Sequence, residues 1–513
     1  MQLSGEEPSG DNRRLTRTGT SLPPVQGLPL GVYRTLAVVY AVSIAIALLN
    51  YGAVDIMPVA LLALPIFCAL TLAFWVWGGP NHVGAAIGAV LILWSVALVW
   101  VFVQSTSLPG PVWFHPAWSA LPPDVAAQAA TISLTPADDW PAFLRLSLPL
   151  AIFLLGLRIF DSDARAAQVL KLIAISGGLA AAAAIAQFIT APKTLLFAPK
   201  PAYFDSLTGF FVNRNTAATY FGIVAIVLLA LTTRVVSVID KSRILHAVNH
   251  RRPLAEGERR RLLRLGFYAC LLLLTLIALM LTRSRAGIGA SVVALTLFLF
   301  IHVVRSGRDA ARADPFRHRQ TSPLRRLLIA AAASAVAATG FLGIAGRALL
   351  RAEVQGSEDG RFCVLPGIVS AIVDYLPFGA GLSGFEAVFP AYRDPTCGIS
   401  LVWDRAHSVY LEGMFTLGLV FPVLLLTGLG VLLYILAKGL RHRRSVRYAP
   451  EAGLAGLVLV ILHSAFDFSL QISGLAIVFA AFLGPVVTIC LTPPGGAAAD
   501  GHVVRRRSSI RPR

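Results

Sequence analysis

Runs of about twenty apolar residues recur from residue 35 to residue 491, and they constrain the fold more than any other feature of this chain. A helix of roughly 20 residues crosses the hydrocarbon core of a bilayer. Because lipid offers no hydrogen-bond partners, each such run predicts a transmembrane helix. The runs lie at residues 35–52, 56–78, 83–104, 143–160, 166–189, 216–235, 266–282, 286–304, 327–346, 411–437, 452–471 and 473–491. The sequence therefore predicts an all-α polytopic membrane protein with about 12 transmembrane helices.

The charged residues indicate the orientation of these helices. Only 14% of residues are charged and 56% are hydrophobic, which excludes an ordinary globular surface. The net charge of +18 could suggest a nucleic-acid partner, but the basic residues are distributed among the loops. With both termini cytoplasmic, roughly 33 of the 44 Lys and Arg residues fall on the cytoplasmic side. The sequence thus predicts an inner-membrane protein that contacts membrane lipids and no nucleic acid.

The same pattern divides the chain into parts. We expect a disordered cytoplasmic tail at 1–32, transmembrane helices 1–9 at 33–346, a periplasmic cap loop at 347–410, transmembrane helices 10–12 at 411–491 and a basic cytoplasmic tail at 492–513. Apolar residues at helical spacing from Pro366 to Tyr375 precede a glycine-rich turn. The large loop between the ninth and tenth spans is therefore predicted to be a folded, partly helical cap. Long ordered loops on a helical scaffold are where sites tend to lie.

Two of the five cysteines lie in this cap. Cys68, Cys270 and Cys490 fall inside apolar runs, where a thiol acts as a small hydrophobic group. Cys363 and Cys397 share the outward loop and can form a disulfide in an oxidising periplasm. The sequence leaves open whether they are close enough to do so.

Arginines on the predicted outer side are the most informative charges, because each was translocated against the positive-inside bias. Arg214 lies at the outer mouth of the sixth span, and Arg283 and Arg285 lie on a short turn between the seventh and eighth. Both clusters stand just before a helix N-terminus, where free N–H groups favour an anion. Snorkelling to lipid phosphates is one interpretation. Two arginines on a tight turn favour a diphosphate, since guanidinium groups bind phosphoryl oxygens bidentately.

A histidine at the end of the cap is the candidate catalytic group. If a helix begins early enough, Asp404, His407 and Tyr410 lie on one of its faces, and a carboxylate can orient the imidazole. An imidazole titrates near neutral pH and can accept the proton of a hydroxyl group. A structural role for His407 is the alternative.

Three other patterns are weaker. Asp161 and Asp163 resemble an Asp-x-Asp metal site, but Asp163 is placed to cap the fifth helix. The glycines from Gly379 to Gly384 lack a βαβ context and predict a turn. His463 and Asp467, within the predicted eleventh span, could be functional or could join two helices, and both interpretations stay open. No cluster has the spacing of a metal site.

Five motifs together resemble the O-antigen ligase and O-antigen polymerase superfamily of bacterial membrane glycosyltransferases. They are Gly209-Phe-Phe-Val-Asn-Arg-Asn-Thr-Ala-Ala218, Thr282-Arg-Ser-Arg-Ala-Gly287, the cap turn after Pro377, His407-Ser-Val-Tyr-Leu-Glu412 and His463-Ser-Ala-Phe-Asp467. The resemblance implies an inverting enzyme without metal or cofactor that takes glycan from an undecaprenyl diphosphate carrier at the periplasmic face.

The resemblance also implies roles for individual residues. Arg214 and Arg285 would hold the diphosphate, and His407 would receive the proton of the acceptor hydroxyl. Arg283 would also contact the diphosphate. Positioned positive charge can stabilise the leaving diphosphate in place of a metal. Further helpers are Arg361, Arg405, Asp404 and Tyr410, although Arg361-Phe-Cys363 departs from the pattern expected at the start of the cap helix.

The acceptor stays open at this point. A growing lipid-linked chain would make the protein a polymerase, to which a chain-length regulator could bind. Lipid A core would make it a ligase in lipopolysaccharide or surface polysaccharide biosynthesis, and a Ser or Thr of a protein would make it an O-oligosaccharyltransferase. A different class is transport of an anion or a lipid-linked sugar, for which His463 and Asp467 would be essential.

Overall fold

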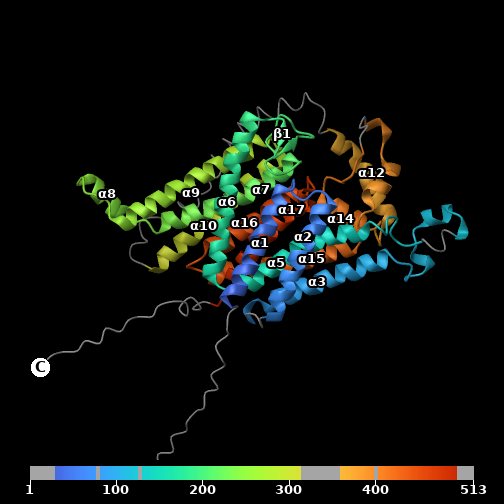
Figure 1. Cartoon of the computed structure of the whole chain (residues 1–513), viewed down its shortest axis with the longest axis horizontal. Coiled ribbons are helices and arrows are strands. Elements are labelled where there is room, and N and C mark those ends of the chain that lie inside the picture. The colour runs from blue at the N-terminus through green and yellow to red at the C-terminus, as the bar shows by residue number, and fades with distance from the viewer. Residues whose placement is uncertain (1–28, 77–80, 125–129, 314–358, 398–401, 494–513) are drawn as a thin grey trace, which may run out of the picture.

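In a computed structural model, the described residues are 29–76, 81–124, 130–313, 359–397 and 402–493. Long helices dominate this part of the chain, and ten of them are long and apolar enough to cross a membrane. They are α1 Leu30–Leu49, α2 Ile56–Val76, α3 Gly84–Gln104, α5 Asp139–Ile159, α6 Asp163–Thr190, α7 Arg214–Ser237, α9 Glu256–Leu281, α10 Arg285–Ala313, α15 Val420–His442 and α17 Ser473–Leu491. Figure 1 shows them as one slanted bundle. The all-α fold is confirmed, with a span count of about ten to twelve.

Three of the twelve predicted spans need separate comment. The ninth, at 327–346, lies outside the described residues. The eleventh was predicted to reach residue 471, but α16 covers only Tyr448–Ser464 and is 17 residues long. A short loop and a 3-10 turn, Ser469–Gln471, replace its last part. Asp467 is therefore in this loop and not inside a helix, contrary to the prediction.

The tenth predicted span, 411–437, is wrong as a single helix. Helix α14, Val409–Leu417, stops at Gly418, which has φ +59° and ψ −142°, and α15 begins at Val420. A Cβ atom on Gly418 would lie 2.1 Å from the carbonyl oxygen of Pro377. The break therefore depends on a glycine where the cap turn crosses the helix end. An apolar run cannot reveal it, because the residues on both sides are equally hydrophobic.

The helix ends form two faces of the bundle. At one end, here called the Arg443 end, Arg443 forms an ion pair with Asp163 at the start of α6. It also donates to the carbonyl of Thr492 after α17, at 2.9 Å. Arg305 of α10 donates a hydrogen bond to the carbonyl oxygen of Leu440 in α15, at 2.6 Å. This end is rich in basic residues, and its location on the cytoplasmic side stays a prediction.

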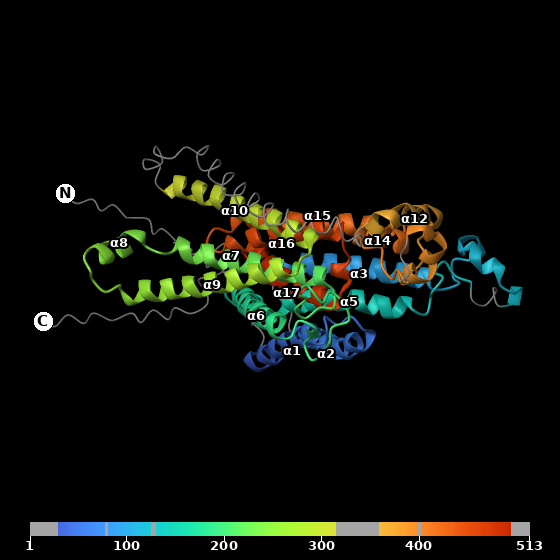
Figure 2. The ribbon, with the colours of Figure 1, turned by 90° about the horizontal axis from the view of Figure 1, so that it is seen from above.

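At the opposite end, here called the Arg214 end, α7 and α10 begin and α6, α9 and α16 end. A connection with two short strands, β1 Thr194–Leu195 and β2 Ala198–Pro199, leads from α6 to α7. The backbone N–H of Leu207 in this connection donates to the carbonyl of Leu281 at the end of α9, at 2.9 Å. Helix α8, Lys241–Asn249, lies far from the cap at the other extreme of the molecule (Figure 2).

The centre of the bundle is formed by α7 and α17, the most buried of the ten candidate spans. Close packing around α7 depends on small residues of α6. A Cβ on Gly177 would lie 2.4 Å from Val224 of α7, and one on Gly178 would lie 2.8 Å from Leu271 of α9. Small residues let helices approach closely in lipid, where there is no hydrophobic drive for association. The positions of α6, α7 and α9 relative to one another are therefore set by this glycine pair.

Residues 359–397 form a compact helical unit beside the bundle. It contains α12 Asp359–Tyr375, α13 Phe385–Val388 and the 3-10 turns Phe389–Tyr392 and Pro395–Cys397. Phe385 and Phe389 stack in its core, with ring centroids 5.0 Å apart, and Phe415 of α14 packs against them. Segment 105–124 lies against it, where His115 stacks on Tyr375 at 4.4 Å. Helix α12 includes the predicted helical segment 366–375.

Candidate functional site

Two helix N-termini meet at the Arg214 end, and each begins with a candidate arginine. Asn213 caps α7 by accepting the N–H of Asn215 at 2.8 Å, and Arg214 is the first residue of the helix. Arg285 is the first residue of α10. A Cβ on Gly287, in the first turn of α10, would lie 2.6 Å from Cβ of Ala218 in α7. The two N-termini are therefore in direct contact, and their dipoles add at one place.

The short turn before α10 is bound to the connection between α6 and α7. Arg283 has a left-handed φ of +55°, and its Nη1 donates to Oδ2 of Asp205 at 2.8 Å. Burial alone would raise the pKa of Asp205, but the Ser206 hydroxyl and Arg283 bring it below its ordinary value. Both partners are more than half exposed, so this ion pair contributes little to stability. It does fix the direction of the Arg283 side chain.

Beneath the two N-termini lies a buried polar cluster that joins α7 to α16. Nδ2 of Asn215 donates to Oδ1 of Asp467 at 2.7 Å, and Ser469 donates to the other carboxylate oxygen. The hydroxyl of Thr219 and Nδ1 of His463 share a hydrogen bond at 2.5 Å. Asp467 is fully buried and His463 is 1% exposed. The sequence left open whether His463 and Asp467 are functional or join two helices. Their contacts with α7 support the second interpretation, and one of them involves Asn215, the residue after Arg214.

His407 lies in an irregular segment before α14 and has a left-handed φ of +51°. Its ring contacts Trp403, at 4.9 Å between centroids, and Phe468, at 5.1 Å. Phe468 follows Asp467 directly, so the imidazole lies beside the loop that ends α16. The predicted helical face of Asp404, His407 and Tyr410 is wrong, because α14 begins only at Val409.

The remaining cap candidates have other contacts. The Tyr410 hydroxyl donates to the carbonyl of Ile461 at 2.8 Å and so ties α14 to α16. Arg405 forms an ion pair with the buried carboxylate of Glu412 at 3.0 Å. The other oxygen of Glu412 accepts the N–H of Ala406 at 2.9 Å, one residue before His407. Arg405 and Glu412 thus hold the segment that carries the imidazole. Arg361 is in the first turn of α12, and its side chain lies outside the described part.

Two groups at this end had no signal in the sequence. The Arg214 guanidinium lies over the ring of Tyr203, at 5.2 Å, and Tyr203 itself has φ +57°. Lys200 is 5% exposed and donates to the carbonyl of Ser206 at 2.6 Å, and burial lowers its pKa while Asp205 opposes that shift. Both residues lie in the connection between α6 and α7, outside the motifs recognised in the sequence. Only the folded chain brings them near the start of α7.

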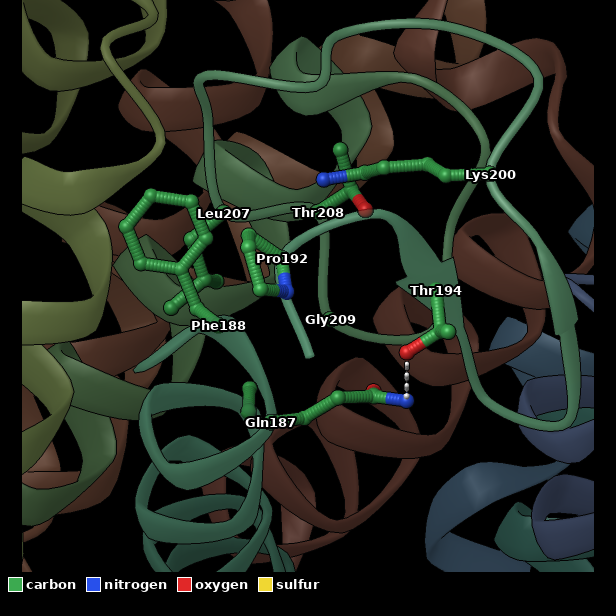
Figure 3. Close-up of a pocket in the computed structure, with 9 residues that line it drawn as sticks. Gln187, Phe188, Pro192, Thr194, Lys200, Leu207, Thr208 and Gly209 are labelled. Carbon is green, nitrogen blue, oxygen red and sulfur yellow. Dashed lines mark hydrogen bonds between the residues drawn. The ribbon is translucent and has the colours of Figure 1, made fainter. Parts of the chain in front are cut away.

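A small pocket opens beside Lys200. Figure 3 shows Gln187 and Thr194 joined by a hydrogen bond of 3.2 Å, with Lys200 on another side of the pocket and Thr208 and Gly209 along its wall. Its volume of about 10 Å³ has room for one water molecule. The pocket therefore belongs to the packing of the connection and is too small for a sugar.

The patterns set aside in the sequence have structural roles. Ser162, and not Asp163 as predicted, caps α6 by accepting the N–H of Arg165. Asp161 pairs with Arg165 at 2.8 Å, while Asp163 pairs with Arg443. In the part of the chain that is described, no three His, Cys, Asp or Glu side chains lie close enough to hold a metal ion.

The glycine segment is a turn, as predicted, with positive φ at Gly379 and Gly381. Cys363 is disulfide-bonded, whereas Cys68, Cys270 and Cys490 are free thiols. The side chain of Cys397 lies outside the described residues, so its pairing with Cys363 stays a prediction.

Comparison with known families gives a match over part of the chain. Residues 270–426 match the family model described as O-antigen ligase, Wzy_C. No curated protein matches the chain. The matched segment contains Arg283, Arg285 and His407, while Arg214 lies outside it. It includes the turn between α9 and α10, the cap unit and the start of α15. The chain is therefore a multi-pass membrane protein with an O-antigen ligase domain at residues 270–426.

Proposed function

We propose that this protein transfers glycan from undecaprenyl diphosphate to a saccharide acceptor at the periplasmic face of a bacterial inner membrane. The O-antigen ligase domain implies glycosyltransferase activity. One observation carries the proposal. Phe468 contacts His407, while its neighbour Asp467 accepts a hydrogen bond from Asn215, the residue after Arg214. A single loop thus connects the candidate base to the candidate anion site.

The donor diphosphate would bind at the paired N-termini of α7 and α10. Arg214 and Arg285 supply two permanent positive charges, and the first N–H groups of both helices supply further donors. Bidentate contacts from guanidinium groups suit a diphosphate. Arg283, directed by Asp205, is the third charge at this mouth. As the bond to the sugar breaks, charge grows on the diphosphate, and fixed positive groups stabilise it most at that stage.

The acceptor hydroxyl would be activated by His407. Its oxygen attacks the anomeric carbon, the bond from that carbon to the diphosphate oxygen breaks, and the diphosphate leaves with the electron pair. The hydroxyl proton passes to the imidazole. Attack opposite to the leaving group inverts the anomeric centre. Trp403 and Phe468 contact the imidazole ring edgewise and restrict its orientation.

The backbone at this end is also unusual. In the described part of the chain, seven residues other than glycine have positive φ, and three of them are Tyr203, Arg283 and His407. Such conformations are costly and gather at functional sites, where the surrounding structure holds them. Each of the three supports or supplies a proposed site group, which favours a pre-organised site over arginines that merely contact lipid.

A complementation experiment tests the proposal. The gene is deleted in its host and restored as wild type, His407→Ala or Arg285→Lys, and surface glycan and lipid-linked precursor are compared on gels. His407→Ala should abolish glycan transfer, whereas His246→Ala, an exposed histidine of α8, should restore it fully. Arg285→Lys keeps the charge and loses the bidentate geometry, so it should transfer far less than wild type. Full transfer by His407→Ala would remove the proposed base.

The same gels identify the acceptor. Loss of a polymerase leaves single repeats on the acceptor, loss of a ligase leaves long chains on the carrier, and loss of a protein O-oligosaccharyltransferase removes glycan from proteins. A transporter predicts the opposite residue pattern: substitution of His463 or Asp467 abolishes flux while His407→Ala is tolerated. The contacts of His463 and Asp467 with Thr219 and Asn215 favour the transferase, since these groups are engaged in packing.

A further inference from the structure

A second group of cations surrounds a cavity at the Arg443 end, far from the candidate site. The cavity has a volume of about 310 Å³ and is lined by Lys171 of α6, Arg234 of α7 and Arg264 of α9. Helix α7 connects the two regions, because Arg214 is its first residue and Arg234 lies in its last turn. A helix of 24 residues is about 36 Å long, so the cavity and the candidate site are on opposite sides of the bundle.

The glycine pair of α6 explains why a cavity forms there. At Gly177 and Gly178 the three helices approach too closely for a Cβ atom. Lys171 lies seven residues before Gly178 on α6, and Arg264 lies seven residues before Leu271 on α9. Two turns beyond the tight crossing, Lys171 on α6 and Arg264 on α9 thus take the positions that correspond to Gly178 and Leu271. They border the space between the helices and leave it unfilled.

Four acidic residues described at this end are bound to arginines outside the cavity. Asp163 pairs with Arg443 and Glu451 pairs with Arg305, both inside the bundle. On α9, Glu256 pairs with Arg260 and Glu258 with Arg261. Among the residues that the structure describes, no carboxylate lines the cavity, and Arg234 is held by the neutral hydroxyl of Tyr448 at 3.1 Å. The three charges of the cavity therefore suit an anionic ligand.

The rest of the lining indicates which anion. Leu231, Val235 and Tyr268 form an apolar wall. Lys171 lies inside the apolar run 166–189 and Arg264 lies two residues before the run 266–282, so both charges are at the edge of the hydrocarbon layer. A phosphate ion from solution would gain nothing from the apolar wall. A lipid presents a phosphate and an acyl chain at this same depth.

We propose that this cavity binds the phosphate headgroup of an anionic phospholipid of the membrane leaflet at the Arg443 end. Lys171, Arg234 and Arg264 contact the phosphate, and an acyl chain runs along the apolar wall. The lipid fills the gap between α6, α7 and α9 and so stabilises the helix that carries Arg214. The inference does not depend on the proposed glycan transfer, because a lipid can bind here whatever reaction occurs at the other end.

Lipid binding to the purified full-length protein in neutral detergent tests the inference. The protein is titrated with phosphatidylglycerol, and in separate arms with phosphatidylcholine and with inorganic phosphate. The double variant Lys171→Gln/Arg264→Gln removes the two exposed cations and keeps the Arg234 contact with Tyr448. Each basic residue near an anionic membrane surface contributes about fivefold in affinity, so the double variant should bind phosphatidylglycerol about 25-fold more weakly.

The control Arg259→Gln/Arg260→Gln removes two exposed charges from the same helix end, outside the cavity. It should bind within about twofold of wild type. The charge-preserving variant Lys171→Arg/Arg264→Lys should also bind like wild type, which separates lost charge from misfolding. Three results would each overturn the inference: equal binding of phosphatidylcholine, an equal loss in the control, or equally tight binding of inorganic phosphate.

Discussion

Replacing Gly418 by alanine should destabilise the joint between the cap unit and the membrane helices. Gly418 has φ +59° and ψ −142°, a conformation that is essentially restricted to glycine and costs other residues about 1–3 kcal/mol. Its Cβ would lie 2.1 Å from the carbonyl oxygen of Pro377 and 2.7 Å from the carbonyl carbon of Phe378. These are backbone atoms, so no flexible side chain can move aside.

The same carbonyl of Pro377 accepts the N–H of Leu419 at 2.9 Å. A methyl group on Gly418 would displace this bond, at a cost of about 0.5–1.5 kcal/mol. Strain and the lost hydrogen bond together predict a loss of about 2–4 kcal/mol in the free energy of unfolding. The matched control is Gly430→Ala within α15, where a Cβ meets nothing within 4 Å. That substitution should stabilise the helix by up to about 1 kcal/mol.

Unfolding by SDS in mixed micelles, followed by circular dichroism, gives both free energies. The two variants should differ by at least about 2 kcal/mol, with Gly418→Ala the less stable. His407 lies in the segment that leads into α14, so Gly418→Ala should also reduce glycan transfer in complementation. If Gly418→Ala unfolds at the same SDS fraction as Gly430→Ala, the helix break is not set by this glycine and the argument fails.

Three further predictions concern the Arg214 end and the cap. Asn215→Ala leaves an oxygen of the buried Asp467 without its donor and should cost about 1–3 kcal/mol of unfolding free energy, whereas a cost near zero in SDS titration would contradict the buried pair. The pKa of Asp205 is lowered, so its ion pair with Arg283 is present above about pH 4 and is lost as the pH falls further. Hydrogen exchange of the Leu207 amide should therefore increase in acid in the wild type, relative to Asp205→Asn. The Asp205→Asn variant should show no such step. Cys363→Ser should cost about 2–5 kcal/mol, measured as earlier proteolysis of the cap, and Cys270→Ser, a free thiol, should leave proteolysis unchanged.

Much of the candidate site was accessible from local sequence. Arg214, Arg283 and Arg285 stood out because each adjoins an apolar run on the side that otherwise lacks basic residues, and each does lie at a helix start or in the turn before one. His407 stood out by its chemistry. The contacts of these residues were not accessible from the sequence, since Tyr203 reaches Arg214 and Phe468 reaches His407 from other parts of the chain.

Two wrong predictions concern the two ends of α14. The helical face of Asp404, His407 and Tyr410 was inferred from spacing alone, but Ser408 caps α14 and places its start at Val409. The tenth span was inferred from continuous hydrophobicity, which does not register the close approach of the Pro377 backbone to Gly418. The start of α14 is thus set by a local cap that residue spacing does not register, and the break at Gly418 is set by a backbone distant in sequence.

The pattern of apolar runs and basic loops was sufficient for an all-α membrane protein, because a bilayer demands long apolar helices of any chain that crosses it. That demand acts on each segment separately, and so it can be recognised locally. The meeting of α7 and α10, the buried Asn215–Asp467 pair and the basic cavity between α6, α7 and α9 required the folded chain. Inside the bilayer the outer surface of every helix is apolar, so hydrophobicity does not show which helix faces contact one another. Small residues and polar pairs on different helices determine those contacts.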